Sequence, residues 1–171
     1  MDSYQRIHFR LPDLRSGKPA RIFHEDANLL VRQQQADLVY IDTPYNSRQY
    51  GDSYHVLESI ARWDCPTVSG VAMKPVDRHA TKSLYSTSEA PTAFDDLVSN
   101  IHARYVLVSY SNMENKGNPR SNAKISAEEI ESILRKRGDV SIYSEPFQPF
   151  SAGKSHITDH REKLYLLKVR K

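Results

Sequence analysis

Five consecutive residues, Asp42 to Asn46, combine chemical groups from which a small ligand site can be built. The segment reads Asp-Thr-Pro-Tyr-Asn and directly follows the apolar run at 36–41. Asp42 supplies a carboxylate that accepts hydrogen bonds, and Tyr45 supplies an aromatic ring that can stack on a planar ligand. In doubly wound sheets, ligands bind beyond the carboxyl ends of strands, where this segment is expected. On the motif alone, an Asp-x-Pro-Tyr sequence is also typical of an ordinary turn.

The strands that would position this segment are predicted from apolar runs. The run at 36–42 predicts a strand buried on both faces, as in a parallel sheet. Other strands are predicted at 20–24, 105–110, 140–143 and 164–169. Helices alternate with them, which predicts an α/β sandwich with a mostly parallel sheet and a terminal antiparallel strand pair.

Helices are predicted at 26–35, 55–63, 92–101 and 126–138. Thr92 is expected to cap the third of these, and Ser126 with Glu129 to form a capping box at the start of the fourth. That fourth helix is expected to end near Gly138, after the basic last turn at 135–137. Residues 1–19 are interpreted as a leader or loop before a single domain at 20–171. Residues 64–91 are rich in proline, serine and threonine and predict a long functional loop.

The composition limits the classes of protein to which the chain can belong. A chain of 171 residues with 39% hydrophobic and 26% charged residues is typical of one globular domain. No apolar window is long enough to span a membrane, and no secretory signal begins the chain. The single cysteine, Cys65, excludes an internal disulfide and a cysteine-based zinc site, and it suits a reducing cytoplasm. The net charge of +3 permits nucleic-acid binding without arguing for it. His156 and His160 have a spacing known from metal sites, but their flanks disfavour a helix, and no metal is expected.

The segment from Val39 to Tyr50 resembles the catalytic segment of the D12 class of DNA adenine methyltransferases, normally written D-P-P-Y-N. Four later stretches, at 54–63, 108–112, 120–126 and 151–156, resemble stretches that follow in the same order in that family. A collinear series over roughly residues 20–170 is far more specific than a four-residue motif. The resemblance implies a Rossmann-like fold, S-adenosyl-L-methionine as cofactor, double-stranded DNA as substrate, and bacterial restriction–modification as the setting.

The resemblance also implies roles for the residues of the motif. Asp42 and the backbone carbonyl of Thr43 or Pro44 would accept the two hydrogens of the adenine N6 amine, which leaves the nitrogen lone pair directed at the methyl donor. Tyr45 would stack on the base, which must leave the duplex at a cost of about a few kcal/mol. Asn46 would support the turn, and Asp42 would also border the cofactor.

Further roles are implied outside the motif. Asp26 follows the first expected strand, where this superfamily contacts the adenine of the cofactor, although an aspartate there can also simply cap a helix. Phe147 and Phe150 would help to grip the extruded base, or else belong to the core. Arg48 and Lys154 are expected to contact phosphates.

Two features depart from the family pattern. Thr43 stands where the family has proline, so the backbone carbonyl is kept but φ is no longer locked. The glycine-rich cofactor loop that precedes this segment in the family has no counterpart, because the six glycines are scattered. We therefore expect an N-terminally incomplete catalytic part, whose missing half or partner subunit holds the cofactor, or a homodimer.

Several alternatives remain open at this stage. The chain is either an enzyme or a non-catalytic remnant that binds DNA or a partner without holding the cofactor. Related motifs also act on RNA and on protein glutamine, although the long downstream match favours DNA. Residues 64–91 are a candidate DNA-contacting insertion. Ser109 and Tyr110 are interpreted as structural strand-end residues, and the basic run at 135–137 as a solvated helix end.

Overall fold

The sheet of the protein is mixed rather than mostly parallel. The computed structural model describes residues 10–13, 16–111, 123–146 and 161–170. Within them, one sheet has the order β1-β4-β6-β5, formed by β1 (Gln35–Ile41), β4 (His102–Ser111), β6 (Arg161–Val169) and β5 (Gly138–Pro146). β1 pairs in parallel with β4, whereas the β4–β6 and β6–β5 pairs are antiparallel. The terminal antiparallel pair is confirmed. The expectation of a mostly parallel sheet is wrong for these residues, because β6 runs between β4 and β5 in the opposite direction to both.

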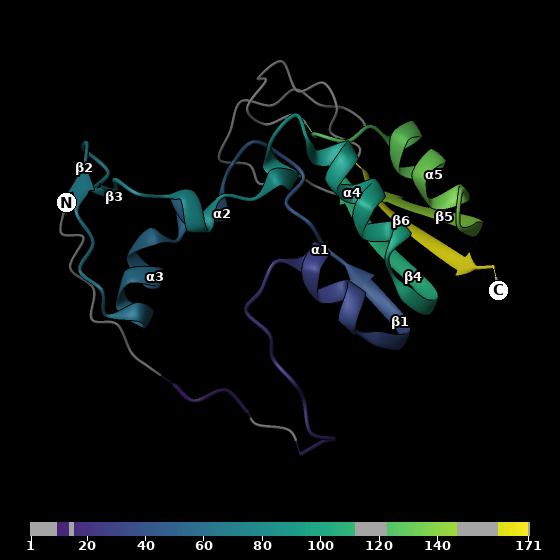
Figure 1. Ribbon diagram of the computed structural model, residues 1–171, viewed down its shortest axis with the longest axis horizontal. Coiled ribbons are helices and arrows are strands. Elements are labelled where there is room, and N and C mark those ends of the chain that lie inside the picture. The colour runs from purple at the N-terminus through teal and green to yellow at the C-terminus, as the bar shows by residue number, and fades with distance from the viewer. Residues whose placement is uncertain (1–9, 14–15, 112–122, 147–160, 171) are drawn as a thin grey trace.

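Three helices lie along the sheet (Figure 1): α1 (Ala27–Leu30), which continues as the 3-10 turn η1 (Val31–Gln33), α4 (Ala90–Ser99) and α5 (Ala127–Arg135). α4 contacts both α1 and α5. The capping box at Ser126 is confirmed, since its hydroxyl accepts from the Glu129 N–H and the Glu129 carboxylate accepts from the Ser126 N–H. The basic run after α5 is bound within the protein: Arg135 pairs with Glu131 and Lys136 with Asp95.

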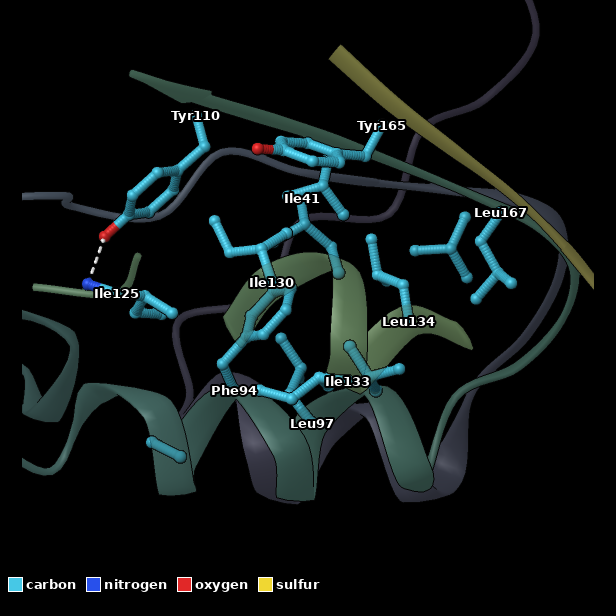
Figure 2. Packing of buried hydrophobic residues seen from close by; sticks show 14 of the residues in the cluster. Ile41, Phe94, Leu97, Tyr110, Ile125, Ile130, Ile133, Leu134, Tyr165 and Leu167 are labelled. Carbon is cyan, nitrogen blue, oxygen red and sulfur yellow. Dashed lines mark hydrogen bonds between the residues drawn. The ribbon is translucent and has the colours of Figure 1, made fainter. Parts of the chain in front are cut away.

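The core fills the space between these helices and the sheet (Figure 2). Phe94 and Leu97 on α4 and Ile130 and Leu134 on α5 point toward the strands, where Tyr165 is completely enclosed. Each of these side chains is at most a few per cent exposed. Burying a large apolar side chain stabilises a fold by roughly 1.5–3 kcal/mol, so this region holds the described part of the chain together.

A second region projects away from the sheet (Figure 1). This arm, residues 50–81, contains α2 (Tyr50–Ser53), α3 (His55–Arg62), the two-stranded hairpin of β2 (Val68–Ser69) and β3 (Lys74–Pro75), and the turn η2 (His79–Thr81). The turn η3 (Leu84–Ser86) then leads back to α4. The helix expected at 55–63 is confirmed, and the long loop expected at 64–91 contains only these short elements.

Two predicted features near the N-terminal side are wrong. Residues 20–24 form no strand, because no described strand lies beside them and Ile22 and Phe23 stay exposed. β1 is a strand but is not buried on both faces. It lies at the edge of the sheet, and of its residues only Ile41 is buried, whereas Leu38 and Tyr40, whose side chains alternate to the opposite face, are exposed.

The predicted start of one helix is also wrong. α4 begins at Ala90 with Glu89 as its N-cap, so Thr92 lies inside the helix. Pro91 explains this, since proline is tolerated in the first helical turn and does not have to precede it. α5 ends at Arg135, close to its predicted end, and Gly138 begins β5, where an added Cβ would collide with the Lys168 carbonyl of β6. The glycine is required there by the close approach of two strands.

Among the described residues, no helix is both long enough and apolar enough to cross a membrane.

Candidate active site

The Asp42–Asn46 segment leaves the sheet at the carboxyl end of β1. Ile41, the last residue of the strand, is buried and pairs with Val108 of β4. Because β1 and β4 are parallel, the end of β4 lies at the same edge and places Tyr110 beside the segment. The fold therefore puts the segment where the sequence predicted, beyond the end of a strand.

Tyr110 anchors this turn through the backbone of Tyr45. The Tyr110 hydroxyl donates to the Tyr45 carbonyl over 3.3 Å and accepts from the Ile125 N–H over 3.1 Å, the second bond being drawn in Figure 2. The Lys124 N–H donates to the same Tyr45 carbonyl over 2.7 Å. The Tyr45 and Tyr110 rings meet edge to face, with centroids 6.1 Å apart. Tyr110 is thus a structural residue, as expected, and it holds the backbone of the turn directly through the Tyr45 carbonyl.

Thr43 leaves an unusual polar atom in this turn. Its Oγ1 is buried and has no hydrogen-bond partner among the described residues. An unsatisfied buried hydroxyl costs roughly 1–3 kcal/mol, so proline at this position would remove that cost. Threonine at this position keeps every backbone carbonyl of the turn and adds this one polar atom.

The residues after Tyr45 are held by local bonds. The Asn46 carboxamide oxygen accepts from the Arg48 N–H over 2.9 Å, a short-range bond that stabilises the turn. Gln49 exchanges two hydrogen bonds with the backbone of Ser83: its Nε2 donates to the Ser83 carbonyl over 3.1 Å, and its Oε1 accepts from the Ser83 N–H over 2.8 Å. These two bonds connect the end of this segment to Ser83, where the chain returns from the arm toward α4.

A large cleft of about 1360 Å³ opens on one side of the turn. Asp26 and Asp42 face it from opposite elements, α1 and the end of β1, together with Glu25. Asp26 is the N-cap of α1, and its Oδ1 accepts from the Asn28 and Leu29 N–H groups. The capping role considered for Asp26 is confirmed, whereas the strand expected before it is absent. Asp26 also lines the cleft, so a ligand bound there would meet this residue.

The wall between α1 and α4 contains a polar network that sequence reasoning missed. Asn28 donates to the Asp96 carboxylate over 2.8 Å, and Arg32 pairs with the same carboxylate over 2.6 Å. The Tyr85 hydroxyl donates to the Asn28 carboxamide oxygen over 2.7 Å. The bond from Asn28 and the pairing with Arg32 lower the pKa of Asp96, whereas burial raises the pKa of Tyr85. These residues are far apart in the sequence and no motif links them, so only the fold brings them together.

A smaller hollow of about 140 Å³ also borders the turn and shares Pro44 with the large cleft. It is lined by Pro44, Tyr45, Asn46, Arg48, Tyr50, Ser53 and Tyr54. Burial is the main cause of a raised pKa for Tyr45, with Glu162 adding to it, so the phenol stays neutral at ordinary pH. Tyr50 and Tyr54 had no role in the sequence-based expectations, although their i, i+4 spacing beside the motif was a visible signal.

Comparison with known families identifies the chain. A model of the D12 class N6 adenine-specific DNA methyltransferases matches residues 4–119. The chain belongs to this family. The segment Asp42–Asn46 lies within the matched residues.

Curated relatives extend the similarity. The modification methylase StsI of Streptococcus sanguinis is 37% identical over 156 residues, which are 89% of this chain and 22% of that protein. The type II methyltransferase M.FokI of Planomicrobium okeanokoites is 37% identical over 77% of this chain and 20% of its own length. The type II methyltransferase M.NlaIII of Neisseria lactamica is 30% identical over 82% of this chain and 39% of its own length. The chain thus spans about a fifth of the first two relatives and about two fifths of the third. No solved structure gives a significant match.

The predicted site residues of this D12 methyltransferase divide into three groups. Asp42, Thr43, Pro44, Tyr45 and Asn46 lie together in the turn, with Arg48 close enough that its charge counters part of the rise in the pKa of Tyr45. Asp26 lies across the large cleft. Phe147, Phe150 and Lys154 lie outside the described residues, as do His156 and His160. The described ranges contain no group of three or more histidine, cysteine, aspartate or glutamate residues suited to a metal.

Proposed function

We propose that this chain carries the catalytic turn of an enzyme that methylates the N6 amine of adenine in double-stranded DNA, with S-adenosyl-L-methionine as methyl donor. One observation supports this most: in a chain of the D12 family, Asp42–Asn46 follows a sheet strand and lines both an acid-bearing cleft and an aromatic hollow. The names of the relatives, type II methyltransferases and modification methylases, support a role in restriction–modification in a bacterial cytoplasm.

The residues of the large cleft fit the proposed cofactor. Glu25, Asp26 and Asp42 contribute carboxylates, which favour a ligand that carries a positive sulfonium and an amine. Leu30, Val31 and Leu97 add apolar wall, as expected for a nucleoside site. When bound, S-adenosyl-L-methionine would supply an electrophilic methyl group, and Asp26 and Asp42 would hold it.

The residues of the turn would prepare the adenine. Asp42 accepts one hydrogen of N6 and the backbone carbonyl of Thr43 or Pro44 accepts the other, which favours a pyramidal nitrogen with its lone pair toward the cleft. The Tyr45 carbonyl already accepts two hydrogen bonds, which supports Thr43 or Pro44 as the acceptor. Stacking on the neutral Tyr45 ring contributes roughly 1–3 kcal/mol and helps to offset the extrusion of the base.

We further propose that a separate polypeptide region completes a Rossmann-like sandwich around the described sheet. β1 is an edge strand in the described residues, and its Leu38 and Tyr40 side chains are exposed. An exposed strand edge with apolar residues favours pairing with another strand. A region that carries the glycine-rich loop, in the same protein or in a partner subunit, would cover this edge, and a homodimer is the other way to cover it.

The region at 64–91 is proposed to contact DNA, because it extends from the side of the sheet that carries the catalytic turn. Exchanging it for the corresponding stretch of a relative with another recognition sequence should change the sequence preference of the complete enzyme. An unchanged preference would rule this role out.

Binding of radiolabelled S-adenosyl-L-methionine to the 171-residue chain tests the main proposal. We expect saturable binding by the wild type and by Asp139→Ala, a control at the opposite edge of the sheet whose carboxylate is largely exposed. Asp26→Ala should abolish it. In a chain that binds the cofactor, Asp42→Asn should lower methyl transfer to adenine-containing DNA by about 10²–10³-fold, the usual loss when one transition-state hydrogen bond is removed.

Absence of binding has two meanings that a second experiment separates. If the upstream part of a relative, added as a separate polypeptide, restores binding, the chain is the catalytic half of a split enzyme. If binding and methyl transfer both stay absent with that addition, the chain is the non-catalytic alternative, and the proposed function is wrong.

A further inference from the structure

The side chain of Asn28 joins three elements that line the large cleft: α1, α4 and η3. Its Nδ2 donates to the Ala93 carbonyl and to the Asp96 carboxylate of α4, each over 2.8 Å. Its Oδ1 accepts from the Tyr85 hydroxyl of η3 over 2.7 Å. A carboxamide has two N–H donors and one oxygen, so the protein itself engages every polar group of this side chain. Asn28 therefore acts as a joint between elements.

The backbone of the same residue fixes the Asp26 carboxylate. The N–H groups of Asn28 and Leu29 donate to one oxygen, Oδ1 of Asp26, over 2.9 and 3.1 Å. α1 is four residues long and none of them is buried, so its position depends on contacts with neighbouring elements. The Asn28 carboxamide makes such contacts only two residues from Asp26. Where Asp26 lies on the cleft thus depends on where Asn28 is held.

Tyr85 is a buried anchor for Asn28. Its side chain is 9% exposed, and its hydroxyl also lies 3.3 Å from the Ala93 carbonyl. Two residues earlier, the backbone of Ser83 exchanges two hydrogen bonds with the side chain of Gln49, which follows the Asp42–Asn46 turn. The same short stretch of chain therefore contacts α1 at one end and the segment after the turn at the other.

We propose that Asn28 and Tyr85 are positioning residues for the methyl donor: they hold α1 against α4 so that the Asp26 carboxylate meets the cofactor in a fixed orientation. The inference rests on the proposed function and extends it to two residues outside the motif. Two bonds to one carboxylate oxygen restrict rotation of Asp26. A group that is already ordered loses less conformational entropy when a ligand binds, which increases affinity.

Asn28→Asp separates positioning from charge. Aspartate has the same shape as asparagine, but its carboxylate donates no hydrogen bond and would face the Ala93 carbonyl and the Asp96 carboxylate. Loss of the joint should weaken cofactor binding, whereas an added negative charge on the cleft would by itself strengthen the binding of a cation. We expect the Kd for S-adenosyl-L-methionine to rise about 10-fold to 100-fold, since two buried donors are lost.

Tyr85→Phe removes one hydroxyl without adding charge, and it should raise the same Kd about 3-fold to 10-fold. Asn100→Asp is the matched control. The Asn100 carboxamide also donates to Asp96, over 3.2 Å to the carboxylate and 2.8 Å to the carbonyl, but it belongs to the C-cap of α4 and does not line the cleft. This control should keep the affinity within about twofold of the wild type.

The binding experiment uses radiolabelled S-adenosyl-L-methionine and the 171-residue chain, with the upstream part of a relative added if the wild type needs it. A second readout needs no methyl donor. Hydrogen exchange of the Leu29 amide, measured by NMR in the free chain, reports whether Asp26 is still held. Asn28→Asp and Tyr85→Phe should accelerate it by roughly 3-fold to 10-fold, while the amides of β4 keep the exchange rates of the wild type.

Three results would overturn the proposal: an affinity of Asn28→Asp equal to or above that of the wild type, an equal loss of affinity in Asn100→Asp, or unchanged exchange of the Leu29 amide in both variants. The second result would show that any weakening of α4 lowers the affinity. Failure of the proposed function would appear in the wild type as a lack of cofactor binding, whereas failure of this inference appears only in the comparison of variants.

Discussion

Helices α5 and α3 have the same kind of sequence pattern and opposite environments. Both have apolar residues at helical spacing on one side. On α5 these residues are buried: Ile130, Ile133 and Leu134. On α3 they are more than half exposed: Val56, Leu57 and Ile60.

The difference shows what an amphipathic pattern specifies. It defines an apolar side for a helix, but burial requires a surface that faces it. α5 has the sheet and α4, whereas α3 belongs to the arm, which projects away from them (Figure 1). The first region supplies stability, and the second supplies exposed surface beside the Asp42–Asn46 turn.

The largest expected effect comes from the same substitution in both helices. Leu134→Ala should lower the free energy of unfolding by about 2–5 kcal/mol, because it leaves a cavity in the core. Leu57→Ala should change it by less than about 0.5 kcal/mol, because this side chain is 63% exposed. Urea denaturation of the two variants measures the difference. Equal losses would mean that α3 is packed in solution as firmly as α5.

A smaller effect is expected where the core meets the turn. Tyr110→Phe keeps the ring but removes the hydroxyl that joins the Tyr45 carbonyl to the Ile125 N–H. The variant should lose about 1–3 kcal/mol of unfolding free energy, since a buried N–H is left unsatisfied. Tyr143→Phe, which changes an exposed tyrosine on β5, should lose nothing measurable. Comparable losses in both variants would show that the bond contributes little.

The start of α5 offers a third comparison. Ser126→Ala removes the capping box and should lower the unfolding free energy by about 1 kcal/mol, while Ser126→Asp should retain most of it. The start of α3 has no side-chain cap, because Tyr54 occupies that position without a capping bond. Thermal unfolding monitored by circular dichroism tests the pair of variants. An unstable Ser126→Asp would indicate that packing, and not capping, stabilises this helix start.

The smallest effect concerns the arm and depends on pH. Hydrogen bonding by Arg78, helped by Lys74, lowers the pKa of Asp52 below its usual value. A carboxyl group with a lowered folded-state pKa contributes stability above its unfolded pKa of about 3.9, and this contribution is lost as the pH falls through the folded value. Asp52→Asn should therefore destabilise the arm by less than about 1 kcal/mol at pH 7 and by less still near pH 3. Hydrogen exchange of the arm amides at the two pH values is the measurement, and an equal effect at both would contradict it.

Most elements were predictable because their patterns are local. The capping box of Ser126 and Glu129, the strand at β4 and the position of Asp42–Asn46 directly after β1 all agree with periodicity and motif. Two predictions were wrong, a strand at 20–24 and the burial of β1 on both faces. Both depend on neighbouring elements, which local patterns do not reveal. The error at Thr92 arose because a proline that the first helical turn tolerates was interpreted as a break.

The sequence by itself determined the resemblance to the D12 family and the order of chemical groups in the Asp42–Asn46 turn, because these depend on residue types at fixed short spacing. Only the tertiary structure decided that Tyr110 holds the Tyr45 carbonyl, that Asn28 and Tyr85 share a network with Asp96, and that Tyr50 and Tyr54 face a hollow. These contacts join residues that come together only once the sheet and helices have packed, and their geometry is set by that packing.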